Sequence, residues 1–322
     1  MIQLSRNSII SLVLLGIMAL LPIFLNDTWL MIGTTFLIFA ALAFSQDIIL
    51  GRAGVFHMGH CVFFGLGAYT TAILNATYGW PILATWIPAV VVPMVIAVIL
   101  AAPIIHLRGD YFLVATIGFN IIFIQVLDND FLGLTNGPNG IFGLDYIKFI
   151  NFEFGSSVWM YYMAFILMAL TFFIMKNLDR SKYGRAMFYI NKDPIAAQSM
   201  GINIRRTKLY AFALGAGIAG AAGSMFAVQY SAVSPTAFSV TQSIILFAIV
   251  IVGGSASLFG VLIGTFVMFV LPEIFRELET WRYLVFGFAM VILMIVRPRG
   301  IWPVKFGDIP KYLIKPKSKD TK

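Results

Sequence analysis

The chain has 322 residues, of which 60% are hydrophobic and only 11% are charged. A soluble protein carries about 25% charged residues, so a soluble globular enzyme is excluded and an all-α polytopic membrane protein is predicted. The formal net charge of +8 would suit a nucleic-acid partner, but the basic residues lie between apolar runs, which indicates membrane topology and no nucleic-acid partner.

Apolar runs of about 20 residues can cross a bilayer as helices. The first run follows Arg6 and ends at Leu20-Leu21-Pro22, without the small residues of a signal-peptide cleavage site, so we expect it to be retained. About ten spans are predicted, near residues 9–25, 29–48, 57–77, 84–105, 111–129, 158–177, 208–229, 241–253, 258–272 and 282–297. The eighth and ninth are short, which indicates tilted, broken or re-entrant segments.

Lysine and arginine positions predict the orientation, because basic residues concentrate on the cytoplasmic side. With the N-terminus inside, all of the 22 basic residues except Lys148, Arg276 and Arg282 fall on the inner side. Both termini are therefore expected in the cytoplasm. Residues 1–303 form the predicted transmembrane permease domain, and the basic cytoplasmic tail 304–322 is expected to contact anionic membrane lipid.

Residues 50–69, LGRAGVFHMGHCVFFGLGAY, contain five glycines, two of the three histidines and the only cysteine. His57 and His60 would share one helix face, but a metal site needs three or four ligands. A phosphate loop would need a Gly-Lys-Ser/Thr sequence, which is absent here. We therefore predict no metal site and interpret Cys61 as a packing residue.

Polar residues inside apolar runs are candidates for function. Thr116 and Asn120 lie one turn apart in the run 111–129 and share a face, while Gln125 follows further along. These side chains either bond to a neighbouring helix or line a path, and residues 241–243 pose the same choice. Asp47, beside Arg52, is expected to form an interfacial ion pair rather than a proton relay.

Small residues recur at intervals of three to five in the predicted spans, around 65–71, 215–223 and 253–264. Such spacing favours close packing of helices. The alternative is that these glycines let backbone polar groups face a cavity.

Two connections are long. The outer one, 130–157, contains LTNGPNGIFG and is expected to be irregular. In the inner one, 178–207, Asp193 can cap a short helix with Pro194 at its first position, and Gly201 can end it. This helix, with the small side chains Ala196 and Ala197, either offers a partner a surface of low relief or lies on the membrane as a connector.

Several ordered motifs carry a family resemblance. Gly184-Arg185-Ala186, DPIAAQSMGIN at 193–203 and KLYAF at 208–212 resemble the cytoplasmic loop of permeases of the branched-chain amino acid (LivM-like) family of ABC importers. The likeness runs from about 45 to 303. It also includes residues 50–69, LRGDYFLVATIGF at 107–119, TNGPNGI at 135–141, GGSASLFGVLIG at 253–264 and RPRGIW at 297–302.

The resemblance implies a type II ABC importer permease fold with inverted repeats, in which loop 178–207 couples to a cytoplasmic ATPase. The residues expected to serve that coupling are Gly184, Arg185, Asp193, Ala196, Ala197 and Gly201. Ile195 stands where the broader importer signature has glutamate. The implied partners are a second homologous permease, two ATPase subunits and an extracytoplasmic binding protein. No Walker motif occurs, so ATP is expected to bind only to the partners and no cofactor to this chain.

The resemblance also implies that residues 50–69 form a glycine-hinged, interrupted entry to the third span, beside the translocation route. His57 departs from the small hydroxylated residue common at that position in the family, whereas His60 matches. The candidate path residues are Gly54, His57, Gly59, His60, Phe64, Gly65, Thr116, Asn120 and Gln125.

The expected function is import of leucine, isoleucine, valine or related amino acids across a bacterial inner membrane. Permeases for urea or short amides are the alternative within the family. An ion-coupled secondary transporter would usually need an acid or base at a span centre, and none is present here. A membrane enzyme would need converging histidines, cysteines and carboxylates, so no catalytic residue is predicted.

Overall fold

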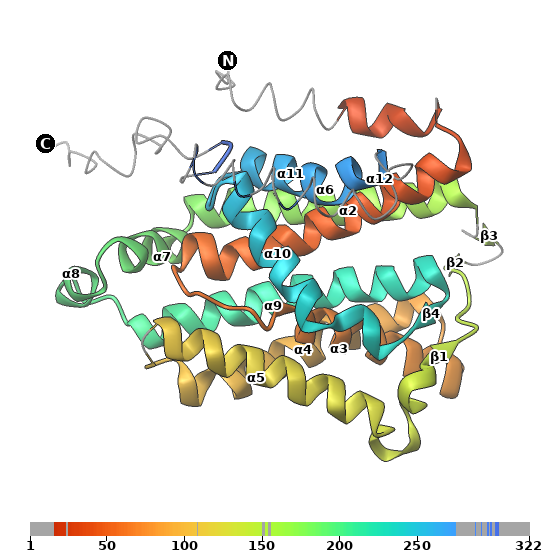
Figure 1. Ribbon diagram of the computed structural model, residues 1–322, viewed down its shortest axis with the longest axis horizontal. Helices are drawn as coiled ribbons and strands as arrows, with labels where there is room; N and C mark the ends of the chain where they lie inside the picture. The colour runs from red at the N-terminus through yellow and green to blue at the C-terminus, as the bar shows by residue number, and fades with distance from the viewer. Residues whose placement is uncertain are drawn as a thin grey trace, which may run out of the picture.

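The computed structural model describes residues 16–23, 25–107, 109–149, 152–153 and 156–274, together with Gly287, Val291, Ile295, Arg297 and residues 300–302. Long helices lie side by side, with α7 and α8 at one end of the molecule and the short strands at the other (Figure 1). The helical elements are α2 (Asp27–Asp47), η2 (Ile48–Arg52), α3 (His60–Ala72), η3 (Ile73–Thr77), α4 (Ile82–Ile104), α5 (Gly109–Asp128), α6 (Ser157–Arg180), α7 (Lys182–Lys192), α8 (Pro194–Ser199), α9 (Ile204–Tyr230), α10 (Val240–Gly253), α11 (Leu258–Thr265), η7 (Phe266–Val270) and α12 (Leu271–Ile274).

Six helices of the described part are long and apolar enough to cross a membrane: Asp27–Arg52, Ile82–Ile104, Gly109–Asp128, Ser157–Arg180, Ile204–Tyr230 and Pro235–Gly253. Each matches a predicted span. Of the two spans expected to be short, 258–272 appears as the shorter apolar helix Leu258–Ile274, whereas 241–253 belongs to the 19-residue helix Pro235–Gly253, which is long enough to cross. The predicted span 57–77 appears as α3 followed by η3. Residues 9–15 and 24 of the first predicted span, most of the predicted span 282–297, and all of the tail 304–322 lie outside the described residues. The count of ten spans and the position of the termini remain predictions.

The α2–α3 connection is an interruption, as predicted for this stretch. After η2, the chain is not helical from Gly54 to Gly59 (Figure 1). Backbone groups away from water need internal partners, and neighbouring side chains supply them here. Gln46 Nε2 donates to the His57 carbonyl at 2.8 Å, and the Met58 N–H donates to Thr116 Oγ1 at 3.2 Å. Side chains of α2 and α5 therefore satisfy backbone groups of this interrupted segment.

Glycines bring α3, α4 and α9 into backbone contact, which confirms the predicted close packing. A Cβ added to Gly67 would overlap the backbone of Gly220, and one added to Gly220 would overlap the carbonyl of Ala89. The same restriction applies where α10 meets α11, between Gly253 and Gly260. Close approach of this kind maximises dispersion contacts, which drive helix association in lipid.

Burial differs sharply among the spans. The most apolar window of α9 is 78% buried, whereas those of α4 and α5 are each 22% buried. Helix α9 is therefore central and α4 peripheral. One stripe of α4 is exposed at every fourth residue, as expected for a helix with one face toward lipid or a partner; it consists of Leu83, Ile87, Val91, Val95 and Ile99.

The loop 130–157 and the segment that follows α9 form short turns and strand pairs. The turns are η4 (Phe131–Gly133), η5 (Gly137–Asn139) and η6 (Pro235–Phe238), and the antiparallel pairs are β1 (Ile141–Phe142) with β4 (Ala232–Val233) and β2 (Lys148–Phe149) with β3 (Phe152–Glu153). Asp130 Oδ1 accepts the N–H groups of Thr135 and Asn136 at 3.0 and 2.8 Å. The TNGPNGI motif thus forms a carboxylate-tied turn within a largely irregular loop.

Candidate functional site

The 178–207 connection is folded throughout, and its first part is a helix that the sequence analysis did not predict. Ser181 caps α7, because its Oγ accepts the N–H of Gly184 at 3.0 Å. A Cβ at Gly184 would overlap the carbonyl of Leu178, so only glycine allows α7 to turn directly off α6. Helix α7 buries Gly184, Met187 and Ile190, spaced by three. That spacing after a serine cap was the available sequence signal.

The predicted short helix is confirmed as α8. Asp193 Oδ1 accepts the N–H groups of Ile195 and Ala196 at 2.9 and 3.1 Å, with Pro194 at the first helical position. Gly201 has a φ of +79°. The Gly201 N–H donates to the Gln198 carbonyl at 2.9 Å, and the Ile202 N–H donates to the Ala197 carbonyl at 3.1 Å. This pair of bonds is the Schellman motif.

The two alanines of α8 have different environments. Ala197 is fully buried and packs α8 onto the rest of the molecule, whereas Ala196 is exposed. Ile195 and Met200 are 78% and 60% exposed. We call Ile195, Ala196 and Met200 the α8 surface. Sequence reasoning did not assign Ile195 or Met200 to it, although apolar side chains in a short hydrophilic connection are a signal for contact with a partner.

Arg185 remains beside α6 rather than on the α8 surface. Its Nη1 donates to the Arg180 carbonyl at 3.0 Å. The bond joins α7 to the last residue of α6, so Arg185 helps to fix the turn at which Gly184 is required.

The histidines of the interrupted segment are both buried but differ in their bonding. His60 Nε2 lies 2.6 Å from Ser45 Oγ, within hydrogen-bond distance. The His57 ring stacks on Phe63 with centroids 5.7 Å apart, and meets Phe212 edge-on at 5.2 Å. Among the residues that the structure describes, neither ring nitrogen of His57 has a hydrogen-bond partner. In the same part of the chain, no group of three His, Cys, Asp or Glu side chains could hold a metal ion.

Thr116 and Asn120 share a buried face of α5, as predicted. Asn120 Nδ2 lies 3.4 Å from both the Phe238 carbonyl and Ser243 Oγ, while its Oδ1 has no partner among the described residues. Ser243 Oγ also accepts the Cys61 N–H at 3.3 Å. Gln125 is exposed and does not join this face. The polar layer therefore links α3, α5 and α10.

A small recess adjoins His57 and Thr116. It holds about 10 Å³, and its walls include Phe63, Ala97, Phe112 and Phe212. That volume is roughly the room one water molecule needs, so the recess is too small for an amino acid in this structure. Gly59 lines the recess with its backbone against the Thr116 carbonyl, where a side chain would not fit.

Phe64 and Gly65 lie away from this recess. Phe64 packs against Phe226 and Phe238, with centroids 5.2 and 5.4 Å away. A Cβ at Gly65 would come within 2.6 Å of the Phe123 ring. Both positions therefore serve aromatic packing between α3 and its neighbours.

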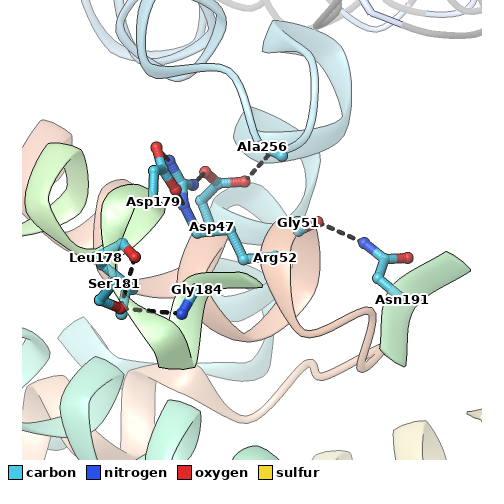
Figure 2. A network of polar contacts seen from close by, with 9 residues as sticks. All are labelled: Asp47, Gly51, Arg52, Leu178, Asp179, Ser181, Gly184, Asn191 and Ala256. Atoms are coloured by element: carbon cyan, nitrogen blue, oxygen red, sulfur yellow. Dashed lines mark hydrogen bonds and ion pairs between the residues drawn. The ribbon is translucent and has the colours of Figure 1, made fainter. Parts of the chain in front are cut away.

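Asp47 and Arg52 form the predicted ion pair, and the structure adds a second carboxylate that the sequence did not indicate. Arg52 Nη1 donates to Asp47, while its Nε and Nη2 donate to Asp179 at 2.7 and 3.0 Å (Figure 2). The Asp47 side chain is fully buried and that of Asp179 is 40% exposed. Asp47, Arg52 and Asp179, here called the charge cluster, join α2 to the end of α6.

Comparison with known proteins identifies the family. Residues 28–294 match the family model described as branched-chain amino acid transport system / permease component. The chain belongs to this permease family. It is 33% identical over 300 residues to the high-affinity branched-chain amino acid transport system permease protein LivM of Escherichia coli (strain K12), covering 85% of this chain and 69% of that protein. The LivM protein of Salmonella typhimurium is 34% identical over 298 residues, with the same shares of both chains.

A more distant similarity involves another solute. The fructose import permease protein FrcC of Rhizobium meliloti is 29% identical over 154 residues, which cover 45% of this chain and 42% of that protein. No solved structure matches the chain significantly. Family membership and the six long apolar helices make this permease a multi-pass protein of the bacterial inner membrane. Its family consists of ABC transport subunits.

Proposed function

We propose that this permease forms half of the membrane channel of an ATP-driven importer for leucine, isoleucine, valine or closely related amino acids. A second homologous permease supplies the other half. Two cytoplasmic ATPase subunits drive it, and an extracytoplasmic binding protein delivers the substrate. The chain itself performs transport, and ATP hydrolysis belongs to the partners.

The main support for a contact with the ATPase is the α8 surface. Helix α8 is capped at both ends, so its shape is fixed before any partner binds. It exposes Ile195 and Met200 at one end of the molecule, beyond α6 and α9 (Figure 1). Apolar side chains held on a rigid, protruding element favour insertion into a partner's groove. The exposed isoleucine makes this contact apolar at the position where the broader importer signature is acidic.

The composition of the recess supports an aliphatic amino acid as the substrate. Four phenylalanines are among its lining residues, and His57 and Thr116 add two polar groups. Small-molecule sites are typically apolar with a few placed polar groups. Phenylalanine walls suit a branched aliphatic side chain, and the polar groups suit its ammonium or carboxylate as the route opens.

Reconstitution tests this proposal. The complete complex is placed in proteoliposomes, and uptake of labelled leucine, isoleucine and valine is measured with the binding protein outside and ATP inside. Uptake should be saturable and should vanish when the ATPase Walker lysine is replaced. Preferential uptake of urea, a short amide or fructose would overturn the substrate assignment while leaving the ATP-driven mechanism intact.

A further inference from the structure

The α7 helix holds the start of the interrupted segment. Asn191, in the last turn of α7, donates from Nδ2 to the Gly51 carbonyl at 2.6 Å, across 140 residues of sequence (Figure 2). Gly54 has a φ of +68°, and a Cβ there would lie 2.8 Å from Asn191 Oδ1. The Asn191 amide therefore spans Gly51 and Gly54, the two glycines at which the chain leaves η2.

A second contact, between Arg52 and Asp179, lies on the other side of the same turn at the end of η2. Asp179, in the last turn of α6, receives two hydrogen bonds from Arg52, the final residue of η2. Paired bonds between a guanidinium and a carboxylate fix orientation as well as distance. Asp47 completes the cluster by accepting the Ala256 N–H at 2.8 Å, from the turn between α10 and α11. Figure 2 shows these contacts gathered around one turn.

This arrangement joins the α8 surface to the recess through few bonds. Only Asp193 separates α7 from α8, so a displacement of α8 moves Asn191 directly. The segment beyond Gly54 is non-helical and reaches His57 within three residues. Such a segment can change its φ and ψ angles without breaking a helix, which is the property of a hinge.

We propose that Asn191 and the Arg52–Asp179 pair are positioning residues that transmit movement of the α7–α8 unit to the His57 segment, and so open or close the recess. This inference rests on the proposed function, because it assumes that an ATPase moves α8. Asn191 links α7 to η2 directly through its hydrogen bond to the Gly51 carbonyl. Asp179 keeps η2 aligned with the end of α6 while α7 moves.

The matched variants are Asn191→Ala and Lys192→Ala in the full complex. Lys192 is the next residue of α7, is exposed, and has its ammonium 5.7 Å from the centroid of the Phe188 ring. Solute transported per ATP hydrolysed should fall about fivefold in Asn191→Ala, the factor that a single hydrogen bond is worth. It should stay at the parental value in Lys192→Ala.

A structural readout separates lost transmission from lost activity. Cys61 is fully buried, so spin labels can be directed to cysteines introduced at Phe56 and Ile99, which are 49% and 64% exposed. In the parent and in Lys192→Ala, an ATP analogue should shift the distance between the labels. In Asn191→Ala the fraction of complexes that show the shift should fall by the same factor, although the ATPase subunits still bind.

Parental coupling and a parental label shift in Asn191→Ala would overturn the proposal. If that variant does not assemble, Asn191→Asp keeps the side-chain volume but places a carboxylate against the Gly51 carbonyl. It should uncouple in the same way, and normal coupling in it would also overturn the proposal. Absence of ATP-driven uptake in the parent would instead contradict the proposed function, so the two failures are distinguishable.

Discussion

The buried carboxylate of Asp47 accepts the backbone N–H of Ala256 at 2.8 Å, although 209 residues separate them in the chain. Ala256 has a φ of +62°, a conformation that L-residues adopt only at a cost. The Asp47 carboxylate thus fixes the turn between α10 and α11 while it neutralises Arg52. One side chain holds together three elements at the same end of the molecule.

Replacing Asp47 should therefore destabilise the permease strongly. Asp47→Asn leaves the buried Arg52 with only the half-exposed Asp179, and breaking a buried ion pair costs about 3 kcal/mol. Asp179→Asn is the matched variant and should cost about 1 kcal/mol, because its side chain is 40% exposed. Thermal unfolding in detergent measures the stability of both variants. Equal losses of stability would show that the burial of Asp47 does not make its ion pair the more important one.

Glycine contacts between helices should be intolerant of even one methyl group. Gly67→Ala should destabilise the fold by about 2 kcal/mol, since its Cβ would overlap the Gly220 backbone. Gly118→Ala on α5 should be neutral or slightly stabilising, because that position faces open space and alanine favours a helix. The melting temperatures of the two variants in detergent should therefore move in different directions. A similar drop in both would refute close packing at Gly67 as the cause.

His57 and His60 should respond differently to substitution by serine. His57→Ser enlarges the recess without removing a side-chain hydrogen bond found in the structure, so the ratio of phenylalanine to leucine uptake should rise by about tenfold. His60→Ser loses the contact with Ser45 and should chiefly lower the melting temperature. An unchanged uptake ratio in a folded His57→Ser complex would show that the recess does not select the solute.

Substitutions on the α8 surface should affect ATPase binding, whereas substitutions in the packed side of α8 should also affect stability. Ile195→Asp should abolish capture of the ATPase subunits and leave thermal stability unchanged, because that side chain is 78% exposed. Ala197→Asp buries a charge and should lower the melting temperature as well. Binding of the ATPase subunits to purified permease in detergent distinguishes the two. Normal binding of the ATPase subunits to the Ile195→Asp variant would show that the apolar contact is not required.

The features that could be predicted from sequence have local causes. Apolar runs specify spans, and the Asp193-Pro194 start and Gly201 end of α8 follow from side-chain capping and a positive φ. Thr116 and Asn120 share a face because the helical period places them there. Each signal lies within a few residues, so no knowledge of the surrounding fold was required.

The remaining features depend on contacts between distant parts of the chain. The bond from Asn191 to Gly51 spans 140 residues, and nothing near either residue indicates the other. The burial of Ala197 beside the exposed Ala196 depends on how α8 rests on its neighbours. Helix α7 was missed for a different reason, since its three buried positions are too few to stand out from a polar connection.

The proposed function requires that ATP hydrolysis in partner subunits drives import through this permease. It is tested most directly by measuring leucine uptake in proteoliposomes of the complete complex, energised either by internal ATP or by an imposed proton gradient. We expect uptake with ATP alone, insensitive to a protonophore and absent without the ATPase subunits. Uptake that requires the gradient, and persists after those subunits are removed, would contradict it.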